Sequence, residues 1–338
     1  MPYQPAEWFP HRACWLAWPS DSSLWCENLP LAQAEFIALC QAIADVDPGT
    51  GLSKGEVLKV LVPDPASEAA AKTALTGIPV DFYRIPFGDI WLRDIAPIFV
   101  QEAGQVLTAC FRFNGWGGKY ILDHDAEVAE AIAQAVGLES RRCDWVLEGG
   151  SIEVDGEGTC LTTRQCLLNP NRNRDFDQTE IETRLSQDLG IKKVLWLDEG
   201  LLNDHTDGHI DTLARFVAPG VVLCMEARDP NDPNHAVLAQ IAADLKNFTD
   251  AQGRTLKVVQ VPSPGLILDE EGEVMPASYV NFYIGNRVVV VPTYGTPWDD
   301  EAVEIISQYF PGRRTVGLSA RAILAGGGAF HCITQQQI

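Results

Sequence analysis

The chain has 338 residues, of which 46% are hydrophobic, and its formal net charge at pH 7 is −21. This apolar content is sufficient for a full core and excludes a disordered chain. The acidic excess argues against a nucleic-acid partner, which needs a basic surface, and favours small cations. No apolar run reaches the length of about 18 residues that a membrane span requires.

The N-terminal segment and the cysteines predict the compartment. The first residues, Met-Pro-Tyr-Gln-Pro-Ala-Glu, lack the basic start and apolar stretch of a secretion signal. The nine cysteines are scattered along the chain, and no pair has the CxxC spacing typical of metal sites. We therefore expect reduced thiols in a cytoplasmic protein.

The N-terminal quarter of the chain predicts alternating strands and helices. Short apolar runs predict strands, and apolar residues with a period of 3.6 predict helices. The expected strands are 14–18, 57–62 and 80–83, and the expected helices are 31–44 and 66–75.

From residue 96 onward, one pattern recurs four times: two strands joined by a turn with Gly, Asn or Asp, then a helix, then a third strand. The expected strand pairs are 96–100 with 106–113, 151–154 with 159–163, 209–217 with 221–225, and 279–284 with 288–291. The expected helices are 127–136, 179–189, 236–248 and 301–310, and the strands that follow them are 143–147, 193–197, 256–261 and 315–318. A repeat of this length favours a radial arrangement of strand-strand-helix-strand units.

The N-terminal elements supply most of a fifth unit. Its hairpin would combine segment 330–335 with strand 14–18, which closes a ring and removes exposed sheet edges. No Ser/Pro/Gly linker divides the chain. We therefore expect residues 1–338 to form a single α/β domain, a five-bladed pseudo-symmetric propeller.

Polar residues fall at the predicted strand ends that would converge on the axis of such a ring. These residues are Asp94, Glu148, His209, Asp211 and Cys332. His209 and Asp211 lie two residues apart on a predicted strand and would face the same side. Gly326–Gly328 precede Cys332, and consecutive glycines let a backbone approach another group closely.

Two chemistries could use these groups. A cysteine nucleophile would need a histidine acid/base and an orienting carboxylate. A metal hydrolase would need nitrogen and oxygen ligands, which His205, Asp207, His209 and Asp211 could offer. The metal alternative leaves Cys332 and its three glycines unexplained, but the residue types alone leave both chemistries open.

Five motifs, in order along almost the whole chain, resemble the agmatine deiminase family. They are Trp91-Leu92-Arg93-Asp94 with Pro97, Phe113-Asn114-Gly115-Trp116-Gly117-Gly118, Glu148-Gly149-Gly150-Ser151, Gly208-His209-Ile210-Asp211, and Gly326-Gly327-Gly328 with His331-Cys332-Ile333-Thr334-Gln335-Gln336. This family belongs to the guanidine-modifying superfamily of five-bladed α/β propellers and includes bacterial peptidylarginine deiminases. The resemblance implies hydrolysis of agmatine to N-carbamoylputrescine and ammonia in putrescine and polyamine synthesis, without a cofactor or a metal.

The same resemblance implies a role for each candidate residue. Cys332 attacks the guanidinium carbon as a thiolate, while Asp94 and Asp211 accept hydrogen bonds from the guanidinium nitrogens. His209 protonates the departing ammonia and then takes a proton from the water that hydrolyses the thiouronium intermediate. Glu148 holds His209 and raises its pKa, since a nearby negative charge favours the imidazolium form.

The residues that meet the far end of the substrate are less defined. The resemblance implies that Trp91 lines the path of the cation by cation–π contact. Asp207 or Asp204 could attract the ammonium group of agmatine. The chain departs from the family at Ala329-Phe330, where members often have Asn-Ile, and at Asp207, where plant members often have Asn.

The alternative substrate is arginine within a peptide or protein. The missing secretion signal favours the small metabolite over a peptide substrate. The sequence leaves the oligomeric state open, with a homodimer or a higher homo-oligomer as expected alternatives to a monomer.

Overall fold

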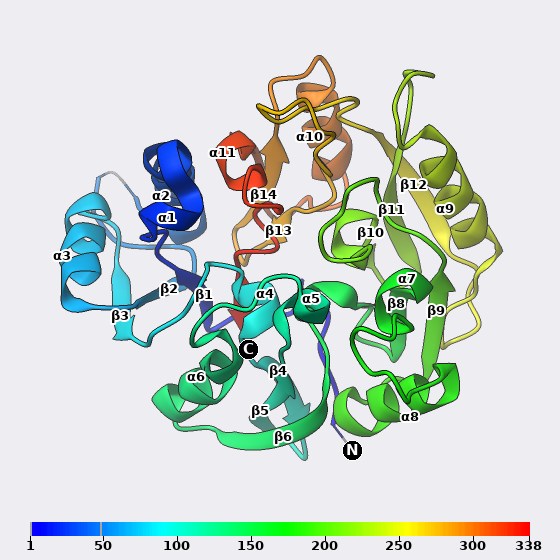
Figure 1. The fold of residues 1–338 in the computed structure, drawn as a ribbon, viewed down its shortest axis with the longest axis horizontal. Helices are drawn as coiled ribbons and strands as arrows, with labels where there is room; N and C mark the ends of the chain where they lie inside the picture. The colour runs from blue at the N-terminus through cyan, green and yellow to red at the C-terminus, as the bar shows by residue number, and fades with distance from the viewer. Residues whose placement is uncertain (1, 48) are drawn as a thin grey trace.

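The computed structural model describes residues 2–47 and 49–338 (Figure 1). Their strands form five small sheets in a mixed α/β fold, one with four strands and four with three strands each. The sheets are separate, and no closed sheet joins them within the described ranges. In Figure 1 the long helices lie at the periphery, whereas α4 and the C-terminus lie near the middle. Within the same ranges, no helix is both long and apolar enough to cross a membrane.

The four three-stranded sheets confirm the predicted repeat. In each sheet the first two strands pair antiparallel, and the third strand pairs parallel with the second. The units are β4 Ile98–Glu102, β5 Gln105–Arg112, α6 Val128–Val136 and β6 Glu139–Val146; β7 Glu153–Val154, β8 Thr159–Thr163, α8 Gln178–Leu189 and β9 Lys193–Leu197; β10 Ala214–Ala218, β11 Val221–Glu226, α9 His235–Asn247 and β12 Lys257–Pro262; and β13 Tyr283–Ile284, β14 Val288–Thr293, α10 Asp299–Ser307 and β15 Arg314–Ser319.

Helix α8 shows how local sequence sets these elements. The Asp177 side chain accepts a hydrogen bond from the backbone N–H of Glu180, which caps the first turn. Gly190 ends the helix in a left-handed conformation with φ of 74°. Ile181, Leu185 and Leu189, at intervals of one helical turn, are buried, so one face of the helix packs against the sheet side of its unit.

The four-stranded sheet joins the two ends of the chain, with strand order β16-β1-β2-β3. Its elements are β1 Ala13–Ala17, α2 Leu29–Ala44, β2 Val57–Val62, α3 Pro65–Ala74, β3 Val80–Arg84 and β16 Gln335–Gln337. Strand β16 pairs antiparallel with β1, and Trp15 Nε1 donates a hydrogen bond to Gln337 Oε1 at 3.1 Å. The expected pairing of the C-terminal segment with the first strand is confirmed, although the paired residues are 335–337 rather than 330–335.

Short helical turns connect the units, and several carry candidate residues. They are α1 Ser22–Trp25, η1 Cys26–Asn28, α4 Leu92–Ile95, α5 Gly115–Gly118, η2 Asp125–Glu127, η3 Gly149–Ser151, α7 Arg164–Leu167, η4 Ile210–Thr212 and α11 Arg321–Leu324.

Two of the predicted strands begin four or five residues later than expected. The strand expected from residue 209 begins at Ala214, because Gly208 takes a φ of 83° and η4 occupies 210–212. The Thr212 hydroxyl donates back to the His209 carbonyl at 2.9 Å, and such local side-chain bonds favour turns over strands. His209 and Asp211 therefore do not share one face of a strand. The strand expected from residue 279 likewise begins only at Tyr283.

Candidate active site

Cys332 lies in the turn before β16, beside the short helix α4. The Cys332 carbonyl accepts a hydrogen bond from the backbone N–H of Arg93 at 3.1 Å. A Cβ atom on Gly326 would lie 2.8 Å from the Trp91 ring, and one on Gly328 would lie 2.7 Å from it. These positions exclude any side chain, which explains two of the three glycines. Gly327 has a φ of 106°, a conformation that other residues rarely adopt.

Three candidate side chains meet around Gly150. A Cβ atom on this glycine would lie 2.6 Å from His209 Nδ1, 2.9 Å from Asp94 Oδ1 and 3.1 Å from Asp211 Oδ2. The Sγ atom of Cys332 lies 3.5 Å from the same Asp211 oxygen. Residues from four distant parts of the sequence thus lie close together, and only glycine at position 150 leaves room for the side chains of His209, Asp94 and Asp211.

Glu148 contacts His209, and Arg172 in turn contacts Glu148. His209 Nε2 lies 3.4 Å from Glu148 Oε2, and Arg172 Nε donates to Glu148 Oε1 at 2.8 Å. All three side chains are buried. Burial by itself would lower the pKa of His209, but the charge of Asp94 and the contact with Glu148 outweigh it and raise this pKa well above its usual range. His209 Nδ1 has no hydrogen-bond partner among the described residues and lies 3.8 Å from Asp94 Oδ1.

The two aspartates have different partners. Asp94 accepts hydrogen bonds from Trp116 Nε1 and from the Gly150 backbone N–H, both at 2.9 Å. Burial raises the pKa of Asp94. Asp211 Oδ2 lies 2.7 Å from His331 Nδ1, and this contact holds the pKa of Asp211 below its usual value against the opposing effect of burial. Asp211 Oδ1 is buried without a hydrogen-bond partner in the described structure.

The same surroundings act against ionisation of the thiol. Cys332 is 8% exposed. Burial, followed by the negative charges of Asp211 and Asp94, raises the pKa of Cys332 well above that of a free thiol. A cation placed between the sulfur and the carboxylates would offset the two negative charges and so lower the pKa of Cys332.

A cavity of about 260 Å³ leads to the sulfur. Its lining includes Cys332, Asp94, Trp91, Trp116 and Asp89. The lining residues in the described structure include no Lys or Arg.

Asp89 fixes the aromatic wall of this cavity. Its carboxylate accepts the indole N–H of Trp91 at 2.7 Å and that of Trp25 at 3.2 Å. The two indole rings stack with centroids 6.1 Å apart.

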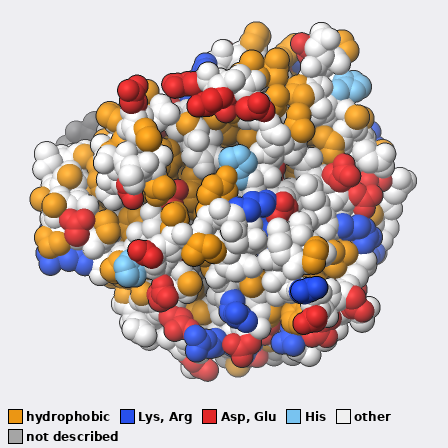
Figure 2. Space-filling model, viewed as in Figure 1, with side chains coloured by type: hydrophobic (Ala, Val, Ile, Leu, Met, Phe, Trp, Pro, Cys, Tyr) orange, Lys and Arg blue, Asp and Glu red, His pale blue; other side chains and the backbone are white. Residues whose placement is uncertain are grey.

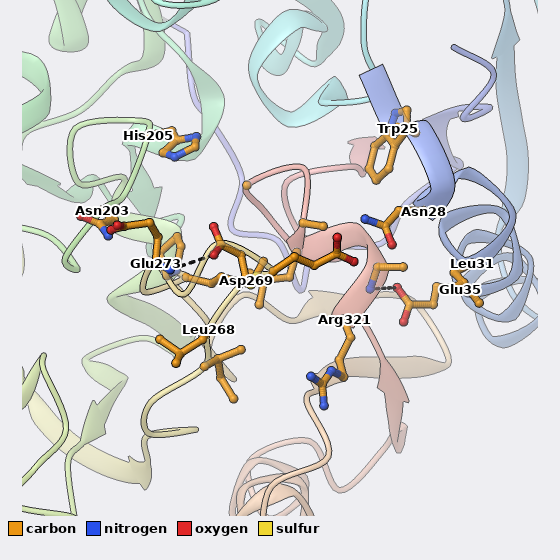
Figure 3. A pocket seen from close by; sticks show the side chains of 18 of the residues that line it. Trp25, Asn28, Leu31, Glu35, Asn203, His205, Leu268, Asp269, Glu273 and Arg321 are labelled. Carbon is orange, nitrogen blue, oxygen red and sulfur yellow. Dashed lines mark hydrogen bonds between the residues drawn. The ribbon is translucent and has the colours of Figure 1, made fainter. Parts of the chain in front are cut away.

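A larger groove of about 1280 Å³ lies outside this cavity and shares Trp25, Tyr120 and His205 with it. Figure 3 shows that its walls come from distant segments, with Glu35 on one side and Asp269 and Glu273 on the other. Asp and Glu side chains also gather near the top of the face drawn in Figure 2. Lys119 and Arg321 also line this groove, but its acidic residues outnumber them, so the groove favours the approach of a cationic molecule to the cavity.

The sequence-predicted residues divide into two sets. Cys332, His209, Asp94, Asp211 and Glu148 come together, and Trp91 lines the cavity. Asp207 does not line it. The Asp207 carboxylate instead accepts hydrogen bonds from Lys119 Nζ at 2.6 Å, from Asn171 Nδ2 at 3.0 Å and from Arg172. A contact between Asp207 and the substrate stays a prediction.

The four residues considered as metal ligands do not form a site. Within the described residues, the group with suitable spacing is Glu148, Cys166 and His209, whose ligand atoms all lie within 4.8 Å of one another. The guanidinium of Arg172 already binds Glu148. A fixed cation beside this group opposes a metal ion there.

Sequence reasoning missed several residues of the site, among them Arg172, Trp116, His331 and Asn281. Asn281 Nδ2 lies 3.2 Å from the sulfur of Cys332. His331 was visible as part of the Cys332 motif, but its contact with Asp211 was not. Arg172 lies among Asn and Pro residues, and this local pattern does not indicate that its side chain is buried.

Comparison with known proteins identifies the family. The model of the Porphyromonas-type peptidyl-arginine deiminases matches residues 3–337. The chain belongs to this family. The agmatine deiminase of Stutzerimonas stutzeri, a relative, is 39% identical over 364 residues, which cover 99% of this chain and 95% of that protein.

Solved structures agree with this membership in the deiminase family. The agmatine deiminase of Enterococcus faecalis superimposes with a TM-score of 0.90 at 33% identity, covering 99% of this chain and 95% of that one. The DDAH of Pseudomonas aeruginosa, at 12% identity, has a TM-score of 0.54 and covers 97% of this chain and all of that one. This second likeness shows a common fold and nothing further.

Proposed function

We propose that this deiminase hydrolyses agmatine to N-carbamoylputrescine and ammonia, the activity named for its relatives in Stutzerimonas stutzeri and Enterococcus faecalis. One observation carries the proposal: the thiol of Cys332 and the buried carboxylate of Asp94 line the cavity, and the buried carboxylate of Asp211 lies 3.5 Å from the sulfur. A planar guanidinium cation at the Cys332 end of this cavity would offer N–H groups to Asp94 and to the unpartnered Oδ1 of Asp211. Its carbon would face the sulfur of Cys332.

The first half of the reaction forms a covalent intermediate. The thiolate of Cys332 adds to the guanidinium carbon and gives a neutral tetrahedral adduct. Protonated His209 transfers its proton to one amino nitrogen, the C–N bond breaks, and ammonia leaves. A cationic thiouronium remains on the sulfur, and His209 is neutral.

The second half of the reaction releases the product. Neutral His209 takes a proton from a water molecule as its oxygen adds to the thiouronium carbon. The C–S bond then breaks, its electron pair returns to sulfur, and the product loses its hydroxyl proton to solvent. One guanidinium and one water thus become a urea and an ammonium ion. Glu148 keeps His209 in the protonated form that each new turnover needs.

The cavity favours agmatine over free arginine. The α-carboxylate of arginine would need a cationic partner, and no Lys or Arg in the described structure lines the cavity. The ammonium of agmatine instead suits an acidic approach. Arginine in a peptide is the second candidate, and it would have to enter from the outer groove.

We further infer that residues 1–338 form one domain in which the five units are the blades of an α/β propeller. The pairing of β16 with β1 supports this inference, since it joins the last unit to the first. A cytoplasmic site of action is supported by nine free cysteines.

The deciding experiment measures ammonia release from agmatine, arginine and an arginyl peptide. We expect agmatine to be the preferred substrate and Cys332→Ser to lower kcat by at least about 10³-fold, because the nucleophile is lost. Cys110→Ser is the matched control, since Cys110 lies on β5 beside Ser140 and does not line the cavity. Full activity of Cys332→Ser would refute the mechanism, and preference for the peptide would refute the substrate.

A further inference from the structure

The side chain of Asn281 contacts the sulfur of Cys332 from the protein interior. Its Nδ2 atom lies 3.2 Å from Sγ, and the residue is 1% exposed. Cys332 lines the cavity, whereas Asn281 does not. The amide therefore reaches the sulfur without occupying the space into which a substrate would enter.

Backbone contacts fix the orientation of this amide. Asn281 Oδ1 accepts hydrogen bonds from the backbone N–H groups of His331 at 3.2 Å and Cys332 at 3.4 Å. Because these two groups can only donate, the atom that faces them must be the amide oxygen. Nδ2 then lies 3.2 Å from the sulfur and 3.4 Å from the Asp211 carbonyl oxygen. Oδ1 lies 3.4 Å from the sulfur and can accept a hydrogen bond from the protonated thiol, whereas only Nδ2 can donate one to the thiolate.

The turn that carries Asn281 is attached to the segment that carries Asp211. The Ser278 hydroxyl donates to the Thr212 carbonyl at 2.7 Å, and Arg215 Nη1 donates to the Phe282 carbonyl at 2.7 Å. The donor, the carboxylate and the sulfur are therefore held in one fixed arrangement. A donor held in place before reaction costs no reorganisation when charge develops on its partner.

We propose that Asn281 is a catalytic residue that donates a hydrogen bond from Nδ2 to the thiolate of Cys332. This proposal rests on the proposed function in one respect, namely that Cys332 is the nucleophile. The bond acts twice in each turnover, when the thiolate attacks the guanidinium carbon and when the C–S bond breaks and returns the electron pair to sulfur.

The charges around the sulfur explain why a neutral donor is needed. Asp211 and Asp94 both oppose the thiolate, and the contact with Asn281 acts in the opposite direction, lowering the pKa of Cys332. A lysine or arginine at position 281 would also stabilise the thiolate, but its charge would repel the guanidinium cation. An amide provides the hydrogen bond and leaves the attraction for the substrate intact.

The test is the pH dependence of Cys332 alkylation in Asn281→Ala. Iodoacetamide is added without substrate, and modification is followed by mass spectrometry of the peptide that contains Cys332, because eight other thiols are present. A hydrogen bond to an ionised group shifts a pKa by about 1 to 2 units, so the pKa of Cys332 should rise by at least about 1 unit. At a pH below both pKa values, alkylation should slow about threefold, since a tenfold smaller thiolate fraction is partly offset by its greater nucleophilicity.

Turnover provides a second readout of the same variant. In Asn281→Ala, kcat for agmatine should fall by about tenfold or more, and the rising limb of the pH–rate profile should move to higher pH. A variant that only loosened the fold would lower activity without moving this limb.

Asn286→Ala is the matched control. Asn286 exchanges hydrogen bonds with the backbone of His11 and does not contact the sulfur. Its loss should leave the pKa of Cys332 unchanged.

A second variant covers the case in which Asn281→Ala does not fold. Asn281→Asp keeps an acceptor for the two backbone N–H groups and keeps the size of the side chain, but it replaces the donor with a negative charge. It should raise the pKa of Cys332 further than Asn281→Ala does.

The outcomes separate this proposal from the proposed function. A wild-type alkylation profile in a folded Asn281 variant would overturn the role of Asn281 even if agmatine is hydrolysed. A raised pKa in a protein whose wild type does not release ammonia from agmatine would support the hydrogen bond and refute the substrate.

Discussion

Asp94 and Asp211 both lie close to Gly150 and are proposed to bind the same guanidinium group, yet their surroundings differ. Asp211 has a partner inside the protein, because His331 lies between it and Glu7, with 2.7 Å on each side. Asp94 has neutral donors, the Trp116 indole and the Gly150 amide, and the His209 ring 3.8 Å away. Accordingly, the pKa of Asp211 is lowered and that of Asp94 is raised.

This difference shows how an acidic site can also hold a nucleophilic sulfur. Two uncompensated carboxylates beside Cys332 would suppress the thiolate, whereas two fully compensated ones would not attract a cation. The site combines one carboxylate balanced by the protein with one that still lacks a cationic partner close enough for a hydrogen bond. We therefore expect the bound substrate to be the cationic hydrogen-bond partner that Asp94 lacks.

The largest effect should come from Asp211→Asn. This change removes a guanidinium acceptor and one of the two carboxylates that contact His331, and breaking a buried salt bridge costs about 3–5 kcal/mol. We expect kcat/KM for agmatine to fall by at least about 10³-fold and the free energy of unfolding to drop at pH 7. Because the pKa of Asp211 is lowered by folding, its stabilising effect is lost as pH falls through the folded-state value. The deficit of the variant should therefore shrink in acid, which denaturant unfolding at several pH values would measure.

Asp94→Asn should separate activity from stability. Activity should fall by about 10²-fold or more because an acceptor for the guanidinium is lost. Stability at pH 7 should fall less than in Asp211→Asn. The raised pKa means that folding disfavours the charged carboxylate, which offsets the loss of an acceptor for one of the two N–H donors, Trp116 or Gly150. Wild-type stability is lost as the pH rises from about 4, the ordinary value for Asp, through the folded-state pKa, and the variant should escape this loss. A loss of stability at pH 7 as large as that of Asp211→Asn would contradict the comparison.

A guanidinium ligand should change the reactivity of Cys332. Alkylation of this residue should be slow in the free protein at neutral pH, because burial and both aspartates raise its pKa. A guanidinium ion too small to block the sulfur should compensate the carboxylates and speed alkylation by about tenfold, and Asp94→Asn should reduce this gain. Peptide mass spectrometry with and without the ion would measure the effect, and equal rates would show that the substrate does not activate its own nucleophile.

The smallest effect should come from Asp207→Asn. This carboxylate is already bound by Lys119, Asn171 and Arg172, so it resembles Asp211 more than Asp94. We expect KM for agmatine to stay within about threefold of wild type and stability to fall by about 1 kcal/mol, as for a partly exposed ion pair. A tenfold rise in KM would instead support the sequence-based prediction that Asp207 meets the ammonium of the substrate.

The sequence predicts which charged groups form the site better than it predicts the contacts that shift their pKa values. Glu148 and Cys332 stand beside glycines at the ends of apolar segments, where local pattern is informative. Asn281 lies in a segment that predicts a strand from 279 to 284. The structure has a turn there instead, because hydrogen bonds to the distant residues Thr212 and Arg215 hold the segment. No local pattern predicts a contact such as that between His331 and Glu7, which are 324 residues apart.

The ladder between β1 and β16 has a consequence for the order in which this protein becomes active. Cys332 precedes by three residues a strand that is held by Ala13–Trp15. During synthesis, Trp15 of the first strand is made 322 residues before Gln337 of its partner strand, and such distant pairings form slowly. We expect the nucleophile to be positioned last, after the other four sheets have folded. A ribosome-bound nascent chain would then hold a nearly complete pocket for guanidinium without the sulfur needed to react with it.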